Sequence, residues 1–199
     1  MKIGVVGAGY VGLTTGICLA SLKHQISIFD MDEGKLEQIR KKNLPFFEKG
    51  LQEILEKVIS TGDLIPQNDV NKLVNETNGC FICVGTPTKN NSIDLTQITK
   101  SVKAITESIK DNQKKNYKII IRSTIIPNTS KNVILPILNK ELSKLGFGLA
   151  VVPEFLREGN AIDDFMHPDR IICGTEDQRA NDVLSQLYAP FVGQGRPLL

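Results

Sequence analysis

Short runs of apolar residues alternate along this chain with segments in which apolar residues recur every three or four positions. A run of about five apolar residues predicts a strand covered on both faces, whereas the longer spacing predicts one face of a helix. The predicted strands lie at residues 2–6, 25–30, 80–84, 117–122, 148–152 and 170–174, with a shorter candidate at 64–65. Because strands and helices alternate, the pattern predicts an α/β fold with a doubly wound, mostly parallel sheet and helices on both faces.

The helices predicted between these strands differ in how clearly their ends are marked. Asp94 precedes one helical pattern, and Gln97 lies three positions after Asp94. This spacing predicts a capping box at the start of that helix. Pro136 lies inside another helical pattern, and we expect it to kink or interrupt that helix. The predicted helices cover residues 13–22, 51–59, 95–109, 129–145 and 178–188.

The first predicted strand runs directly into a glycine-rich turn, Gly7-Ala8-Gly9-Tyr10-Val11-Gly12. Gly7 permits a tight turn after the strand, Gly9 lets a pyrophosphate approach the backbone, and Gly12 lets the next helix pack closely against the sheet. The free N–H groups and the positive end of the dipole of that helix would then face the phosphates. The turn therefore predicts a dinucleotide site of the Rossmann type.

The end of the second predicted strand indicates which dinucleotide would bind. It carries Asp30, near the place where such sites use an acid to bind the adenosine ribose. A carboxylate there disfavours the extra phosphate of NADP, and Lys35 is the only nearby cation, so NAD is the predicted cofactor. Taken alone, these residues leave a second interpretation open, in which they are only a glycine-bearing turn and an acidic strand end without a dinucleotide site.

Small and polar residues collect at the carboxyl ends of the later strands, where ligands bind in open α/β sheets. Val84-Gly85-Thr86-Pro87-Thr88 follows one strand, the next ends in Arg122-Ser123-Thr124, and a third ends in the segment Pro153–Gly159. Their convergence predicts a place for a cofactor and a substrate. Two alternatives stay open: Thr124 could simply end a strand, and the two glutamates of the third segment could pair with Arg157 on the surface.

Composition excludes several classes of function. A formal net charge of +2 gives no argument for nucleic acid or an anionic membrane, and no apolar run approaches the ~20 residues of a membrane span. Cys80 and Cys83 are spaced so that a strand would point them to opposite faces, which favours core thiols over metal ligands. The expected location is the cytoplasm, with reduced thiols. We assign no role to His24 or His167.

Several segments beyond the glycine turn resemble the UDP-glucose/GDP-mannose dehydrogenase family. They occur in family order and read MKIGVVGAGYVGL, FDMDEGK, FICVGTPT, RSTIIPNTS, PEFLREGNAIDDF and HPDRIICG. PEFLREG followed by HPDR is more specific than the glycine turn, and it looks more like the UDP-glucose branch than the GDP-mannose or UDP-N-acetylmannosamine branches. The resemblance implies oxidation of a sugar C6 alcohol to a carboxylate, with two hydrides passed to two NAD molecules through an aldehyde and a cysteine thioester.

The resemblance also implies roles for particular residues. Glu154 matches the family's catalytic glutamate, which is thought to work with a water held by the threonine that Thr124 matches. The implied NAD contacts are Gly7, Ala8, Gly9, Tyr10, Val11, Gly12, Asp30, Lys35, Val84, Gly85, Thr86, Pro87, Thr88, Ser123, Thr124 and Glu158. The implied contacts to the UDP-sugar are Glu154, Phe155, Leu156, Arg157 and Glu158. No metal ligand is implied.

The resemblance covers one part of the family's chain. Residues 1–199 match the NAD-binding domain, whereas family members continue into a central helix and a second domain with the nucleophilic cysteine, which none of the four cysteines here matches. We therefore expect no completed oxidation by this chain alone. We expect the full-length protein to form a homodimer or a larger assembly. For this chain alone, a monomer is an alternative. Two other interpretations stay open: a standalone NAD-sensing regulatory module, and the NAD domain of another two-domain dehydrogenase, for instance of GDP-mannose, UDP-N-acetylmannosamine or 6-phosphogluconate.

Overall fold

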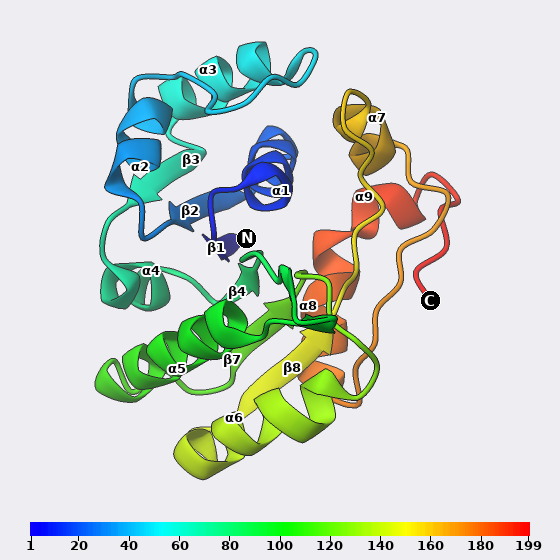
Figure 1. The fold of residues 1–199 in the computed structure, drawn as a ribbon. Coiled ribbons are helices and arrows are strands. Elements are labelled where there is room, and N and C mark those ends of the chain that lie inside the picture. Colours follow the sequence, from blue (N-terminus) through cyan, green and yellow to red (C-terminus); the bar gives the residue numbers. More distant parts are fainter.

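Six parallel strands form the central sheet of the computed structural model, which describes residues 1–199 (Figure 1). Their order is β3-β2-β1-β4-β7-β8, so the direction of winding reverses between β1 and β4. The strands are β1 (Lys2–Val6), β2 (Gln25–Phe29), β3 (Leu64–Gln67), β4 (Gly79–Ile82), β7 (Tyr117–Ile121) and β8 (Phe147–Val151). The predicted doubly wound parallel sheet is confirmed, and the ligand-binding crevice of such a sheet lies at this reversal point.

Helices cover both faces of the sheet (Figure 1). The α-helices are α1 (Tyr10–Ser21), α2 (Glu33–Arg40), α3 (Leu51–Thr61), α4 (Val70–Glu76), α5 (Thr96–Asp111), α6 (Leu135–Leu142), α7 (Ala161–Met166), α8 (Gln178–Leu187) and α9 (Ala189–Val192), and a π-helical turn, η1 (Ser130–Ile134), precedes α6. Residues of α1, α3 and α8 pack in a core of 28 buried residues on one face. Residues of α4, α5 and α6 pack in a second core of 15 buried residues on the other face.

Strand β4 shows why its apolar run has no alternation of polarity. Cys80 and Ile82 are buried in the smaller core, whereas Phe81 and Cys83 are buried in the larger one. Successive side chains point to opposite faces of a strand, and here both faces are covered by helices. The expected separation of Cys80 and Cys83 onto opposite faces is therefore confirmed, and all four cysteines are free.

The predicted strand at 170–174 is wrong. Only two single bridges form there, an antiparallel one between Val151 and Gly174 and a parallel one between Ile171 and Leu198. Side chains take the place of a neighbouring strand along β8, because Thr175 Oγ1 donates to the carbonyl of Leu149 at 2.7 Å. In the same way, Arg179 Nη2 donates to the carbonyl of Phe147 at 2.9 Å. At the other edge of the sheet the short candidate at 64–65 is a regular strand, β3.

The sequence signals for helix ends and interruptions have different outcomes. Asp94 Oδ1 accepts a hydrogen bond from Thr96 N at 2.8 Å, so Asp94 caps the first turn as predicted, although the helix boundary falls at Leu95. Gln97 does not complete the capping box, because Asp94 N donates to the carbonyl of Pro87 at 2.8 Å. Pro136 stands in the first turn of α6, after the π-helical turn, so the predicted interruption is confirmed. The sequence patterns did not reveal α2, α4, α7 and α9.

A hairpin also went unpredicted, between β5 (Thr88–Lys89) and β6 (Ser92–Ile93), which pair antiparallel. Its two turn residues, Asn90 and Asn91, have φ of 51° and 60°. Asparagine tolerates positive φ better than most residues, and tight hairpin turns require it at both central positions. The Asn-Asn pair was therefore a usable signal for this hairpin.

Candidate active site

The glycine turn after β1 is shaped by the space its three glycines leave. Gly7 has φ +102°, and a Cβ there would lie 2.8 Å from the carbonyl oxygen of Cys83. A Cβ on Gly12 would overlap the carbonyl oxygen of Gly7, and it would lie 3.0 Å from the Cβ of Cys83. A Cβ on Gly9 would meet no atom within 4 Å. Two glycines therefore permit close internal packing, whereas the third presents bare backbone to the outside.

The start of α1 leaves hydrogen-bond donors free for a ligand. Gly9 is the cap residue, and no side chain accepts from the N–H groups of the first turn. The first intrahelical bond runs from Leu13 N to Gly9 O at 2.9 Å. The N–H groups that precede it have no helical partner, and they lie at the positive end of the helix dipole. This helix start can bind a phosphate.

Asp30 stands beside the glycine turn, as expected from its place after β2. Its Oδ2 accepts from Ala8 N at 2.7 Å, and its Oδ1 accepts from Asp32 N at 2.9 Å. Lys35 Nζ lies 3.8 Å from Oδ2. The carboxylate is thus fixed next to the turn, where it can accept hydrogen bonds from a ribose. Bare backbone at Gly9, an uncapped helix and this carboxylate together fit a dinucleotide.

Hydrogen bonds join the loops that follow β4 and β7. Ser123 Oγ donates to the carbonyl of Val84 at 2.6 Å, and Thr86 Oγ1 donates to the carbonyl of Thr124 at 2.7 Å. Ser123 is buried, whereas Thr124 is exposed. The two strand ends therefore form one continuous wall beside the glycine turn.

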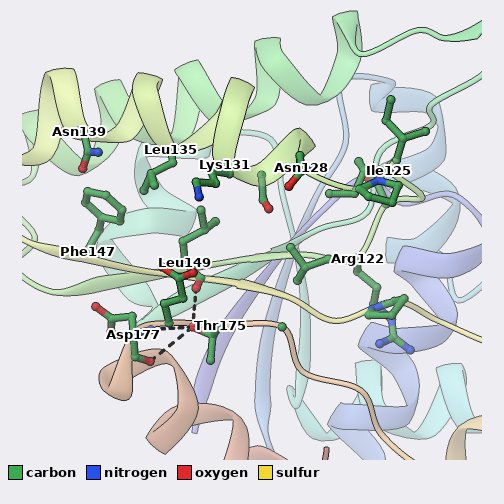
Figure 2. A pocket seen from close by; sticks show the side chains of 18 of the residues that line it. Arg122, Ile125, Asn128, Lys131, Leu135, Asn139, Phe147, Leu149, Thr175 and Asp177 are labelled. Carbon is green, nitrogen blue, oxygen red and sulfur yellow. Dashed lines mark hydrogen bonds between the residues drawn. The ribbon is translucent and has the colours of Figure 1, made fainter.

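Thr124 and Glu154 line the same cavity, whose volume is about 1040 Å³. Figure 2 shows this cavity between α6 and the segment that carries Thr175 and Asp177, with apolar side chains of β8 along it. Glu154 is half-buried, and its Oε2 accepts from Leu156 N at 2.6 Å. The fold thus brings the predicted threonine and glutamate together at the carboxyl ends of β7 and β8.

Arg122, which the sequence places at the end of the same strand as Thr124 but to which no role was assigned, also lines this cavity. The side chain is buried and forms no ion pair; its Nε donates to Thr15 Oγ1 at 3.0 Å. Its guanidinium lies 6.0 Å from the ring of Phe81 and 5.8 Å from the ring of Phe165. Contacts of this kind stabilise a desolvated cation. A fixed positive charge therefore stands at the wall that carries Glu154.

The segment after β8 is held by Asp164 of α7. Arg157 donates to this carboxylate through Nη2 at 2.6 Å and through Nε at 3.1 Å. These hydrogen bonds, which outweigh the effect of partial burial, hold the pKa of Asp164 well below its usual range. The alternative in which Arg157 pairs with the nearby glutamates is wrong, because neither Glu154 nor Glu158 forms an ion pair.

Glu48 is a residue of the site that the sequence analysis missed. Its side chain is 3% exposed, and it accepts hydrogen bonds from Tyr10, Gly159 and Ala161. Tyr10 belongs to the glycine turn, and the other two follow the segment of Glu154. No motif marks this glutamate, because its partners are far away in the sequence.

The thiols and imidazoles have structural surroundings. Burial raises the pKa of Cys18, Cys80 and Cys83 to about 12, and it also raises the pKa of Cys173. A nucleophilic cysteine needs an accessible thiolate, so none of the four is suited to that role. His24 contacts the amino terminus, and the exposed His167 contacts Asp163.

Two kinds of site are not found in the structure. No group of three or more His, Cys, Asp or Glu side chains could hold a metal ion. None of the helices has the length and apolar character needed to cross a membrane.

Known proteins resemble this chain over its whole length. A sequence model described as "UDP-glucose/GDP-mannose dehydrogenase family, NAD binding domain" matches residues 1–192. A UDP-glucose 6-dehydrogenase of Rickettsia felis is 36% identical over 196 residues, which are 98% of this chain and 42% of that protein. A GDP-mannose 6-dehydrogenase of Pseudomonas syringae pv. syringae is 38% identical over 192 residues, which are 94% of this chain and 44% of that protein.

Solved structures agree with the sequence relatives. A ternary complex of GDP-mannose dehydrogenase from Pseudomonas aeruginosa superposes with a TM-score of 0.94 at 32% identity, covering 100% of this chain and 46% of that one. This chain spans less than half the length of these relatives. The predicted family and the predicted cofactor are confirmed. The chain belongs to the UDP-glucose/GDP-mannose dehydrogenase family and is an NAD-binding domain of that family.

Proposed function

We propose that this domain serves the oxidation of the C6 alcohol of UDP-glucose to the carboxylate of UDP-glucuronate. The observation that carries the proposal is the cavity that Thr124 and Glu154 line together at the carboxyl ends of β7 and β8. The free thiols are typical of a reducing compartment, so we place the enzyme in the cytoplasm.

The cofactor site proposed here uses backbone and small side chains. Gly7–Gly12 would hold the pyrophosphate, and Asp30 with Lys35 would hold the adenosine ribose. Val84–Thr88 and Ser123 would line the nicotinamide end, with Glu158 close to it. Bound NAD supplies a hydride acceptor. The residues of the chain bind and orient it, and their hydrogen bonds across the loops of β4 and β7 keep that end of the site in place.

Proton transfer at the sugar is assigned to the cavity wall. We propose that the Thr124 hydroxyl holds a water molecule and that Glu154 accepts its proton. A half-buried carboxylate within a walled cavity is suited to general base catalysis. The Glu154–Glu158 segment would contact the sugar nucleotide.

The choice of UDP-glucose rests on two sequence motifs, one in this segment and one after it. PEFLREG and HPDR look like the UDP-glucose branch. GDP-mannose is the second candidate, because a GDP-mannose 6-dehydrogenase is 38% identical to this chain. The thioester chemistry needs a reactive thiol, and the four thiols here are buried with raised pKa values or half-buried. We therefore expect the 199-residue chain alone to bind NAD without forming NADH from either sugar nucleotide.

A chimera tests the proposal. Residues 1–199 would replace the matching part of the Rickettsia felis enzyme, and NADH formation would be followed with UDP-glucose and with GDP-mannose. Glu154→Gln is expected to lower kcat by ~10²–10⁴-fold with little change in the KM for NAD, because it removes a general base. Glu176→Gln, which alters another carboxylate of the same cavity, is the matched control. Activity with GDP-mannose alone would reject the substrate, and full activity of Glu154→Gln would reject the catalytic role.

A further inference from the structure

Glu48 is a buried carboxylate without a cation. It lies in the loop between α2 and α3, and its side chain is 3% exposed. A desolvated carboxylate is destabilising unless hydrogen bonds compensate. Here Tyr10 Oη donates to Oε2 at 2.6 Å, Gly159 N donates to Oε2 at 2.8 Å, and Ala161 N donates to Oε1 at 3.0 Å. Both oxygens are therefore used.

These donors belong to the two segments of the site. Tyr10 is the first residue of α1, within the glycine turn, and its backbone stands where a phosphate would bind. Gly159 lies near the end of the segment that carries Glu154, and Ala161 is the first residue of α7, directly after that segment. Tyr10 Oη also lies 3.3 Å from the carbonyl of Arg157 in that segment. Glu48 thus joins the cofactor side of the site to the catalytic side, and its own loop is far from both in sequence.

The protonation states suit a permanent connection. Burial would raise the pKa of Glu48, but the bonds from Tyr10, Gly159 and Ala161 outweigh it and hold the pKa below its ordinary value. Burial and the bond to Glu48 raise the pKa of Tyr10 well above its ordinary value. Glu48 therefore stays an acceptor and Tyr10 stays a donor across the neutral range. Asp164 is the other carboxylate facing Glu48, and its negative charge is compensated by the ion pair with Arg157.

We propose that Glu48 is a positioning residue that ties the segment of Glu154 and Glu158 to the glycine turn, so that a dinucleotide bound at α1 orders the catalytic segment. The role of the segment in catalysis rests on the proposed function, but the connection itself does not. Tyr10 carries the effect in both directions: its backbone faces the phosphates, and its hydroxyl reaches Glu48. A ligand that orders one end of such a chain of contacts orders the other.

Amide hydrogen exchange of the 199-residue chain, with and without NAD, tests this connection. In the unaltered chain we expect NAD to slow exchange at Gly159 and Ala161. Glu48→Gln cannot accept from all three donors, so exchange at these two amides without NAD should rise at least ~10-fold, and slowing by NAD should be lost. Glu53→Gln, an exposed change on α3, is the matched control and should behave like the unaltered chain.

A second variant keeps the test decisive if Glu48→Gln does not fold. Tyr10→Phe removes one hydroxyl and leaves both backbone donors on Glu48. In this variant NAD should no longer slow amide exchange at Gly159 and Ala161. Without NAD, exchange at these two amides should rise less than it does in Glu48→Gln. The double variant should weaken NAD binding no more than the stronger single variant. Unchanged exchange in Glu48→Gln, or slowing by NAD that survives Tyr10→Phe, would overturn the role of Glu48. Full turnover of Glu154→Gln in the chimera would reject the proposed function and leave the exchange result standing.

Discussion

The glycine turn and the segment at 153–160 meet through Tyr10 and Glu48, yet they are held by different means. The turn is fixed by excluded volume, because Cβ atoms on Gly7 and Gly12 would press on backbone atoms. The segment is fixed by polar contacts from outside it, from Asp164 of α7 and from Glu48. The cofactor side therefore depends on the absence of side-chain atoms, whereas the catalytic side depends on a few carboxylates that a single polar substitution can remove.

The largest expected effect comes from adding one methyl group to the turn. Gly12→Ala places a Cβ on the carbonyl of Gly7, so the start of α1 must move, at a cost of about 3 kcal/mol. Denaturant unfolding should show this loss, and calorimetry should show no NAD binding.

Gly9→Ala is the matched control for the turn. Its Cβ meets open space, so stability should stay within about 0.5 kcal/mol of the unaltered chain. NAD affinity should nevertheless fall roughly tenfold, which is ~1.4 kcal/mol, because the methyl group stands where the pyrophosphate approaches. Equal stability of the two variants would contradict the view that excluded volume fixes the turn.

A smaller effect is expected on the polar side. Asp164→Asn weakens the contacts with Arg157 and should lower the free energy of unfolding by about 1–2 kcal/mol. The folded state lowers the pKa of Asp164, so the stabilisation is fully present above the unfolded pKa of ~3.9 and is lost as the pH falls toward the folded pKa.

Unfolding curves of both proteins between neutral and acid pH measure this difference. The difference in free energy of unfolding between the unaltered chain and Asp164→Asn should be constant near neutral pH and should become smaller below pH ~4. Asp163→Asn, which changes an exposed neighbour whose side chain hydrogen-bonds only to His167, should leave neutral stability unchanged. If this difference became larger in acid, Asp164 would stabilise the fold in some other way.

The smallest effect belongs to the wall between the two regions. Ser123→Ala leaves the carbonyl of Val84 without its donor and should lower the free energy of unfolding by about 0.5–1 kcal/mol. Ser92→Ala removes an exposed hydroxyl from the hairpin and should change nothing measurable. If the two variants are equally stable, the wall is held by the strands alone.

The two regions also differ in how far the sequence predicts them. The glycine turn and Asp30 could be predicted because each acts within a β–α–β unit whose parts are close in sequence. Glu48 could not, because its partners lie far away and no periodic pattern marks it. Arg122 could be placed at a strand end, but its role could not be predicted, because its partner Thr15 is 107 residues away. The false strand at 170–174 shows the reverse error: its apolar residues suit a strand, but polar side chains of residues 175 and 179 already occupy the carbonyls of β8.

Those occupied carbonyls have a consequence for how copies of the domain can meet. Along β8 the outward carbonyls of Phe147, Leu149 and Val151 each have a donor from the same chain. At the opposite edge β3 contains Pro66, which has no N–H to offer. A second chain could extend the sheet at β8 only by displacing these contacts, and at β3 it would find no N–H at Pro66, so edge-to-edge polymerisation is disfavoured. A second copy is therefore expected to meet the domain through side chains on other surfaces.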